Sequence, residues 1–205
     1  MLGFMHFADA RFGWWEDRET AVRKAEAYTQ RALALDPDTP DAHRTVAGLH
    51  LIKSEFAAAA AAARRAVELG PNLADALVFA GFVLQCSGSP EEAIHLIEKA
   101  MALSPAYPAN YLGQLGNAYR LVGRMEDALR AFRGYHARSP GFGLADIVIL
   151  HEQAGRLAEA RETATQLLAA RPGFTVTAWA RTQFRCDTDQ LAADLASLRA
   201  AGVPD

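Results

Sequence analysis

Cysteine is scarce in this sequence, with only Cys86 and Cys186 among 205 residues. They lie far apart and have no spacing of the kind that binds a metal ion, so a disulfide framework is not expected. A reducing, cytoplasmic location is favoured. Lysine and arginine form no block, and the net charge is −3. The electrostatic footprint of a nucleic-acid-binding protein is therefore missing, and we expect no nucleic-acid partner.

Long apolar runs are also lacking. The alanine-rich run 57–63 is short and is followed by Arg64 and Arg65, so it does not predict a membrane span. Residues 1–7 lack a basic segment, and the acidic Asp9 follows too soon for a signal peptide. We therefore expect no contact with a membrane.

The composition is that of a folded protein rich in helix. Apolar residues make up 51% and charged residues 22%, as in globular rather than disordered chains. Much of the apolar share is alanine, which favours closely packed helices over a sheet of β-branched residues.

A repeated segment organises the chain. Residues 32–37, 65–71 and 100–105 are close copies that end in proline, and weaker copies end at Pro140 and Pro172. The prolines at positions 37, 71, 105, 140 and 172 are 34, 34, 35 and 32 residues apart. This period is typical of stacked helical hairpins, each of which buries its apolar face against its neighbours. We therefore predict an all-α fold, a right-handed α-α superhelix of about five hairpins with C-terminal capping helices.

The predicted organisation has three parts: a degenerate N-terminal hairpin over residues 1–37, four repeat units over 38–172, and capping helices over 173–205. Three glycines are expected to take the left-handed conformation in the turns inside units: Gly88, Gly123 and Gly155. Ser89, with Glu92 three residues later, predicts a capping box. In the last part, residues 174–184 are predicted to form one helix, and Asp187 is predicted to cap another.

The repeats resemble those of the tetratricopeptide repeat family. Unit four carries that pattern most fully, with Leu112, Gly116, Tyr119, Ala128, Phe132 and Pro140 at the corresponding positions. Unit three matches with Leu77, Gly81, Leu84, Ala93, Ile97, Ala100 and Pro105. Small residues stand where helices cross closely, and large ones fill the gaps.

A narrower resemblance concerns the two ends and the middle of the chain. Residues 10–17, 111–120 and 198–204 are similar to the C-terminal tetratricopeptide region of bacterial class III adenylate/guanylate cyclases, and related regions occur on winged-helix transcriptional regulators. This resemblance implies a regulatory module of a longer signalling protein or a stand-alone relative. It transfers no catalytic activity, because neither a cyclase core nor a DNA-binding domain is present in the sequence.

The family resemblance also implies a peptide-binding groove lined by the first helix of each unit. The groove candidates are Arg44, Phe79, Phe82, Gln85, Gln114, Asn117 and Arg120, with Gly48, Asp146 and Glu152 at related positions. The phenylalanines offer apolar contact, and the polar residues offer hydrogen bonds to a peptide. The alternatives are an ordinary solvated surface or a groove filled by the terminal helix.

The N-terminus is dense in aromatic residues: Phe4, Phe7, Phe12, Trp14 and Trp15. One interpretation is that they plug the open end of the helical stack. The other is that they form a docking or self-association surface.

Catalytic, cofactor-binding and metal-binding signals are weak. His151-Glu152 begins like a zincin helix, but Gly155 stands where the second histidine is required. His43 and His50 share a helical face and are more consistent with core positions than with metal ligands. We therefore predict that the chain is not an enzyme and has no cofactor. The predicted function is a scaffold that binds a protein, a peptide or a second copy of itself; the alternative is a regulatory tail of a nucleotide cyclase or transcriptional regulator.

Overall fold

The computed structural model describes all 205 residues, which form twelve helices and no strand. The prediction of an all-α protein is thus confirmed. None of the helices combines the length and the apolar composition that crossing a membrane requires. Contacts divide the chain into two compact units, residues 1–105 and 106–205, which are described separately.

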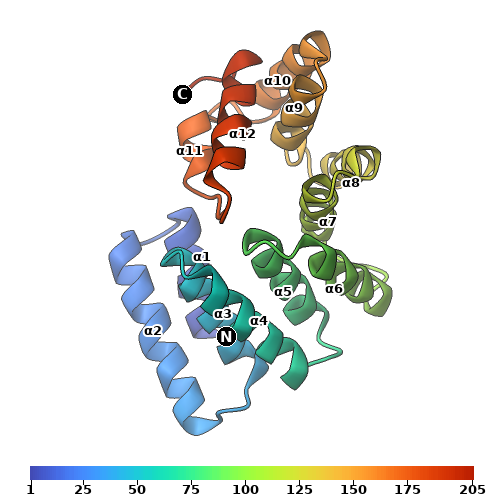
Figure 1. Ribbon diagram of the computed structural model, residues 1–205. Coiled ribbons are helices and arrows are strands. Elements are labelled where there is room, and N and C mark those ends of the chain that lie inside the picture. The colour runs from blue at the N-terminus through green and yellow to red at the C-terminus, as the bar shows by residue number, and fades with distance from the viewer. The chain divides into compact units, whose positions relative to one another are not determined.

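The first unit consists of three helical hairpins (Figure 1). Its helices are α1 (Leu2–Phe12), α2 (Arg18–Leu35), α3 (Pro40–Ile52), α4 (Phe56–Leu69), α5 (Ala74–Cys86) and α6 (Pro90–Leu103). Successive hairpins pack through α2 against α3 and through α4 against α5. In addition, α1 contacts α3, so the first helix lies against a neighbouring hairpin as well as its own partner.

The second unit contains two more hairpins and a C-terminal pair. Its helices are α7 (Asn110–Leu121), α8 (Met125–Arg138), α9 (Leu144–Gln153), α10 (Leu157–Ala170), α11 (Val176–Ala180) and α12 (Thr188–Ala200). The prediction of one helix over residues 174–184 was wrong, because α11 is a short helix of 5 residues. Its first backbone N–H belongs to Val176 and donates to the Pro204 carbonyl at 2.7 Å, so the C-terminal segment, rather than a longer helix, completes this end of the unit.

Left-handed residues end the first helix of each predicted hairpin. Gly88, Gly123 and Gly155 have φ angles of 86°, 78° and 73°, which confirms the predicted conformation. In the turn between α3 and α4 the same region is occupied by Ser54, with φ 59°. A side chain there is strained where glycine would not be, so the turn geometry is retained at some cost in stability.

Helix caps agree with the sequence prediction at one position and differ at another. The Asp187 carboxylate accepts a hydrogen bond from the Gln190 N–H at 2.9 Å, as expected for the cap of α12. The Ser89 side chain makes no capping bond, so the predicted capping box was wrong. The start of α6 depends instead on Pro90 in the first turn, whose missing N–H leaves no donor unpaired.

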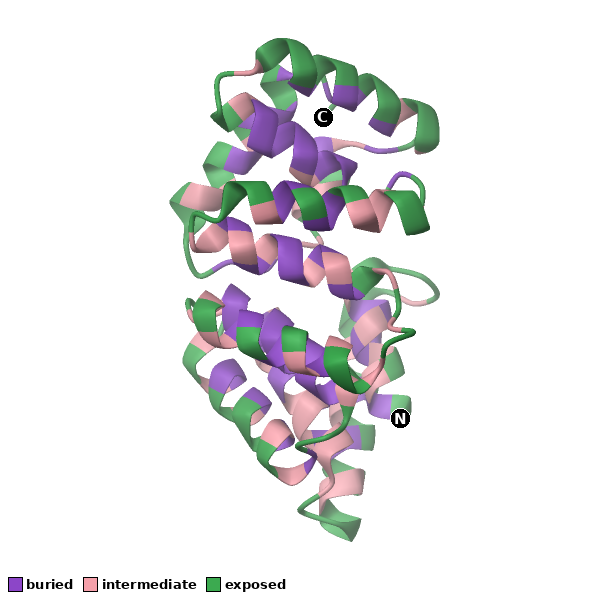
Figure 2. Ribbon diagram, turned by 90° about the vertical axis from the view of Figure 1, so that its right-hand side faces the viewer, coloured by how far each residue is buried: buried purple, intermediate pink, exposed green.

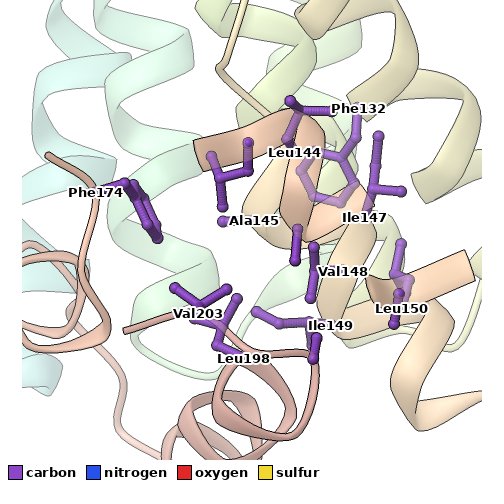
Figure 3. Close-up of a cluster of buried hydrophobic side chains, with 14 of the residues drawn as sticks. Phe132, Leu144, Ala145, Ile147, Val148, Ile149, Leu150, Phe174, Leu198 and Val203 are labelled. Carbon is purple, nitrogen blue, oxygen red and sulfur yellow. The ribbon is translucent and has the colours of Figure 1, made fainter. Parts of the chain in front are cut away.

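Most helices bury one side and expose the other, as the purple and green bands of Figure 2 show, whereas α5 and α9 are buried over most of their surface. In α4 the buried positions are all alanine: Ala59, Ala60, Ala63 and Ala66. Small side chains at these positions allow close approach of the neighbouring helices. In the second unit, α9 supplies the centre of a large apolar cluster, with Phe132 of α8, Phe174, Leu198 and Val203 around it (Figure 3).

Candidate functional site

Most groove candidates of the first unit contact α1. The ring of Phe79 on α5 contacts the rings of Phe4 and Phe7, with centroids 5.1 and 5.5 Å apart and the planes nearly perpendicular. The Arg44 guanidinium on α3 lies 3.9 Å from the centroid of Phe4. Edge-to-face ring pairs and a cation over a ring are favourable packing geometries. The surface that the sequence assigns to a peptide is therefore in contact with the chain's own first helix.

Gly48 shows how closely α1 approaches α3. A Cβ atom added to Gly48 would lie 2.7 Å from the ring of Phe7, which is fully buried. The other two candidates, Phe82 and Gln85, are also buried, and the Arg11 guanidinium of α1 lies 4.3 Å from the Phe82 ring centroid. Only a glycine at position 48 leaves room for the Phe7 ring.

In the second unit, α12 and the segment before it contact the candidates on α7. The Arg120 guanidinium donates two hydrogen bonds to the two carboxylate oxygens of Asp194, at 2.6 and 2.7 Å. Their side chains are 2% and 0% exposed, so this is a fully buried ion pair. The Asn117 carbonyl oxygen accepts from the Arg185 guanidinium at 3.3 Å. Gln114, on the same helix, is partly buried.

Residues of α9 extend the contact with α12. The Gln153 amide donates to an Asp194 carboxylate oxygen at 3.1 Å, and the Ser197 hydroxyl donates to the Glu152 carboxylate at 2.7 Å. Asp194 therefore receives three donors from two helices, which is how a buried carboxylate is stabilised. In the conformation described, the chain's own terminal segments, rather than solvent, meet the groove candidates Arg44, Phe79, Phe82, Asn117 and Arg120. Use of these residues by an external partner stays a prediction.

Burial and neighbouring charges shift the pKa values of Arg120 and Asp146. Burial works against the charged form of Arg120, but the hydrogen bonds and charge of Asp194 outweigh it and raise the pKa of the guanidinium. Burial raises the pKa of Asp146 to about 6, although the nearby charges of Arg120 and Arg185 lower it. Asp146 is thus half-protonated near pH 6 in the folded protein, whereas an unfolded chain releases this proton near pH 4.

Replacing Asp146 with asparagine should stabilise the protein above pH 6. Because the folded-state pKa is raised, the contribution of Asp146 to stability is fully present below pH 4 and is lost as the pH rises through about 6. Each pKa unit corresponds to about 1.4 kcal/mol, so we expect Asp146→Asn to raise the free energy of unfolding by roughly 2–3 kcal/mol at pH 8 and to change it little at pH 4. Urea unfolding at both pH values checks this, with the exposed Asp189→Asn as control; equal effects at both would contradict it.

The N-terminal aromatic residues divide into a buried and an exposed group. Phe4 and Phe7 pack inward with Leu49 and Phe79, which fits the interpretation of a plug. The other three, Phe12, Trp14 and Trp15, are 45%, 53% and 65% exposed and are named the aromatic cluster here. Phe12 stacks on Trp14 with ring centroids 5.1 Å apart, and Trp14 meets Trp15 edge-on at 5.4 Å.

The loop that carries the two tryptophans is held in a defined conformation. One carboxylate oxygen of the buried Asp9 accepts hydrogen bonds from the backbone N–H groups of both Trp14 and Trp15, each at 2.8 Å. Gly13, with φ 65°, ends α1, and Asp17 caps α2 through the Thr20 N–H at 2.9 Å. The exposed rings are therefore presented on an ordered backbone rather than on a free terminus.

Comparison with known sequences identifies the repeats. Two family models, both described as tetratricopeptide repeat, match residues 22–74 and 112–142. The chain thus contains tetratricopeptide repeats, and its all-α fold is that of a tetratricopeptide-like solenoid.

Similar solved structures have low sequence identity and share the fold. The type IV pilus biogenesis factor PilW is 19% identical, with a TM-score of 0.72 over 98% of this chain and 89% of that protein. A thermophilic tetratricopeptide repeat protein of Thermus thermophilus is 21% identical, with a TM-score of 0.67 over 97% of this chain and 95% of that one.

A curated relative is the transcriptional regulator HilA of Salmonella typhimurium. It is 29% identical over 114 residues, which cover 56% of this chain and 20% of HilA. The chain therefore matches only about a fifth of the length of that regulator.

The sequence interpretation did not identify which residues of the terminal helices meet the groove candidates. Asp194 shares the apolar face of α12 with Leu191, Leu195 and Leu198. Asp194 and Leu198 are both fully buried. A carboxylate on the apolar side of an amphipathic helix signals a buried cationic partner. That signal could have pointed to an arginine, but not to Arg120 among the several that the chain contains.

Proposed function

We propose that this chain is a non-catalytic protein-interaction module and that its docking surface is the aromatic cluster. The observation that carries the proposal is the exposure of Trp14 and Trp15 on a loop held by Asp9. Tryptophan is enriched among the residues that dominate binding energy at protein interfaces. A loop ordered before binding loses little entropy when a partner engages it.

The contacts of the groove candidates support this choice of surface. In the first unit Phe79 and Arg44 pack against α1, and in the second unit Arg120 is paired with α12. An external peptide would have to displace a helix and, in the second unit, leave two buried charges without partners. Breaking such a pair costs several kcal/mol, whereas the aromatic cluster is reached without rearrangement.

The partner that fits this surface is a protein with an apolar recess. Exposed indole and phenyl rings bury large apolar areas, and the indole N–H groups can still donate at the rim. A second copy of the chain is an alternative occupant, to be distinguished by experiment.

Replacing both tryptophans tests the proposal. We expect Trp14→Ala with Trp15→Ala to weaken partner binding by at least about 30-fold, since a hot-spot residue contributes about 2 kcal/mol or more. The circular dichroism spectrum should remain that of the parent, because both rings are exposed. Affinity capture from the source cell with the parent and the double variant identifies proteins that need these rings, and the purified partner then gives the two affinities.

The matched control is Leu35→Ala with Met125→Ala, which removes two other exposed apolar side chains. Sedimentation velocity over a range of concentrations tests self-association with the same proteins. If the tryptophan variant binds the partner as tightly as the parent does, the docking surface is elsewhere.

The HilA similarity favours a second candidate, a regulatory module within a longer transcriptional regulator. It supports that form of the alternative rather than a nucleotide-cyclase tail. The coding region on both sides of this sequence provides the test: an in-frame DNA-binding domain supports the candidate, and stop codons that bound the chain on both sides oppose it.

A further inference from the structure

Three side chains that bind metal ions in many proteins converge beside the aromatic cluster. His6 and Asp9 lie three residues apart on α1, which places them on the same face of the helix. Glu16 reaches the same point from the loop before α2. One atom of each side chain, a ring nitrogen or a carboxylate oxygen, lies within 4.8 Å of the other two. His6 Nδ1 and Glu16 Oε2 are 4.0 Å apart.

Each of the three side chains has one buried polar atom without a hydrogen bond. His6 Nδ1, Asp9 Oδ2 and Glu16 Oε2 are all buried and make no hydrogen bond. Asp9 is the most enclosed of the three, at 1% exposed, and its other oxygen is occupied by the N–H groups of Trp14 and Trp15. A buried carboxylate oxygen without a donor is costly, so this arrangement calls for a positive charge at the point where the atoms meet.

Neighbouring side chains hold two of the ligands in place. The His6 ring stacks on Tyr28 of α2, with centroids 5.4 Å apart and planes inclined by 3°. The Lys24 ammonium pairs with Glu16 Oε1, whereas the other oxygen, Oε2, is the one that lies 4.0 Å from His6 Nδ1. Such outer contacts orient metal ligands in proteins. The charge of Lys24 also opposes a nearby cation, so the affinity should be moderate.

We propose that His6, Asp9 and Glu16 bind a divalent first-row transition-metal ion, with Zn²⁺ as the representative. One imidazole and two carboxylates suit such ions, whereas Ca²⁺ and Mg²⁺ prefer oxygen ligands alone. The two carboxylates balance the charge of the ion. Ligand atoms at about 2.1 Å from one zinc ion are roughly 3.4 Å apart in a tetrahedron. The 4.0 Å between His6 Nδ1 and Glu16 Oε2 therefore needs to shorten by about 0.6 Å, and no pair of ligand atoms needs to shorten by more than about 1.4 Å, which small side-chain rotations can supply.

The ion would fix the loop that carries the aromatic cluster. Glu16 directly follows Trp15, and Asp9 already holds the Trp14 and Trp15 N–H groups through its other oxygen. A metal ion between Asp9 and Glu16 would thus clamp both sides of the loop to α1. The idea that this clamp regulates docking rests on the proposed function. The binding of the ion is independent of that function.

Titration of the full-length chain with Zn²⁺ tests the site. In metal-free buffer, isothermal titration calorimetry should show one ion bound per chain. Glu16→Gln and His6→Ala should each weaken binding at least about tenfold, since loss of even an outer-shell contact weakens metal sites by about 10–100-fold. Asp9 is left intact because it also holds the loop. Circular dichroism confirms that each variant is folded.

Two controls separate this site from other donors. His43→Ala removes a histidine remote from the cluster, and Cys186→Ser removes the exposed thiol; neither should change the affinity. Co²⁺ adds a spectroscopic test, because a thiolate ligand produces a charge-transfer band that a site with one histidine and two carboxylates lacks. Failure to bind Zn²⁺, or binding that Glu16→Gln and His6→Ala leave unchanged, would overturn the proposal.

Tryptophan fluorescence reports whether the bound ion changes the surroundings of the loop. In a Trp179→Phe background, Trp14 and Trp15 are the remaining fluorophores, and Zn²⁺ should change their emission in the parent but not in the His6→Ala variant. The chain with Trp14→Ala and Trp15→Ala should still bind Zn²⁺ as the parent does. Metal binding and partner binding can therefore fail independently, which keeps the two proposals distinguishable.

Discussion

Replacing Asp194 with alanine is expected to lower the free energy of unfolding of the second unit by about 3–5 kcal/mol. The Arg120 guanidinium, 2% exposed, would lose both hydrogen bonds to the carboxylate and remain buried with its charge. It could regain water only if α12 moved away from α7. The cost is therefore that of an uncompensated buried charge, which is far larger than the value of a surface ion pair.

The measurement needs a probe confined to the second unit. Trp179 lies against the apolar cluster of that unit, so its fluorescence reports urea unfolding once Trp14 and Trp15 are replaced by phenylalanine. The exposed pair Arg64–Glu92 provides the matched control. Glu92→Ala removes this pair and should lower the free energy of unfolding by less than about 1 kcal/mol. Urea unfolding of the whole chain, followed by circular dichroism, measures this change.

Removing both charges shows whether Asp194→Ala is destabilising because it leaves a buried charge unpaired or because it removes packing contacts. The double variant Arg120→Met with Asp194→Leu should recover most of the stability lost by Asp194→Ala, because apolar side chains of similar volume leave no charge unpaired. If Asp194→Ala lay within about 1 kcal/mol of the parent, or if the double variant were less stable than the single one, the pair would not be what holds α12.

Replacing Gly116 with leucine should destabilise the second unit through overpacking. A Cβ atom at this position would lie 2.8 Å from the ring of Phe132, which is fully buried. Neither α7 nor α8 can retain its position once a larger side chain enters, so we expect a loss of about 1–3 kcal/mol or more. The Trp179 signal gives the unfolding midpoint.

The control for this substitution is Gly173→Leu. An added Cβ atom there meets nothing within 4 Å. An unchanged midpoint for Gly116→Leu would show that Gly116 is not at a close helix crossing, and would contradict the register assigned to the repeats.

Local patterns were sufficient to predict the hairpins. The repeat prolines and the glycines at 88, 123 and 155 act within a few residues of their own positions, through a missing N–H or a left-handed φ angle. Capping by Ser89 could not be predicted in this way, because a serine that can accept a hydrogen bond still needs the backbone angles that point it at the helix.

The five N-terminal aromatic residues were predicted as one set, and the sequence did not separate the buried ones from the exposed ones. Phe4, Phe7 and Phe12 share a helical spacing, yet the first two are inside and Phe12 is outside. Their burial differs because Gly48 leaves room for the Phe7 ring, whereas Phe12 at the end of α1 is covered only in part, by Trp14 and Arg11. The convergence of His6, Asp9 and Glu16 was missed entirely, since the turn at Gly13 that brings Glu16 back toward α1 is not encoded in the spacing of the ligands.

The amino-acid sequence was enough to establish an all-helical chain of tetratricopeptide hairpins, because the period, the small residues at crossings and the turn signals are each local. Local patterns could not predict which segments of the chain pack against the first helices of the repeat units. Contact of Phe4 with Phe79, and of Arg120 with Asp194, joins residues 75 and 74 positions apart in the chain. Such pairs depend on which terminal segment fills a face better than water does, and that competition is resolved only when the helices are packed together.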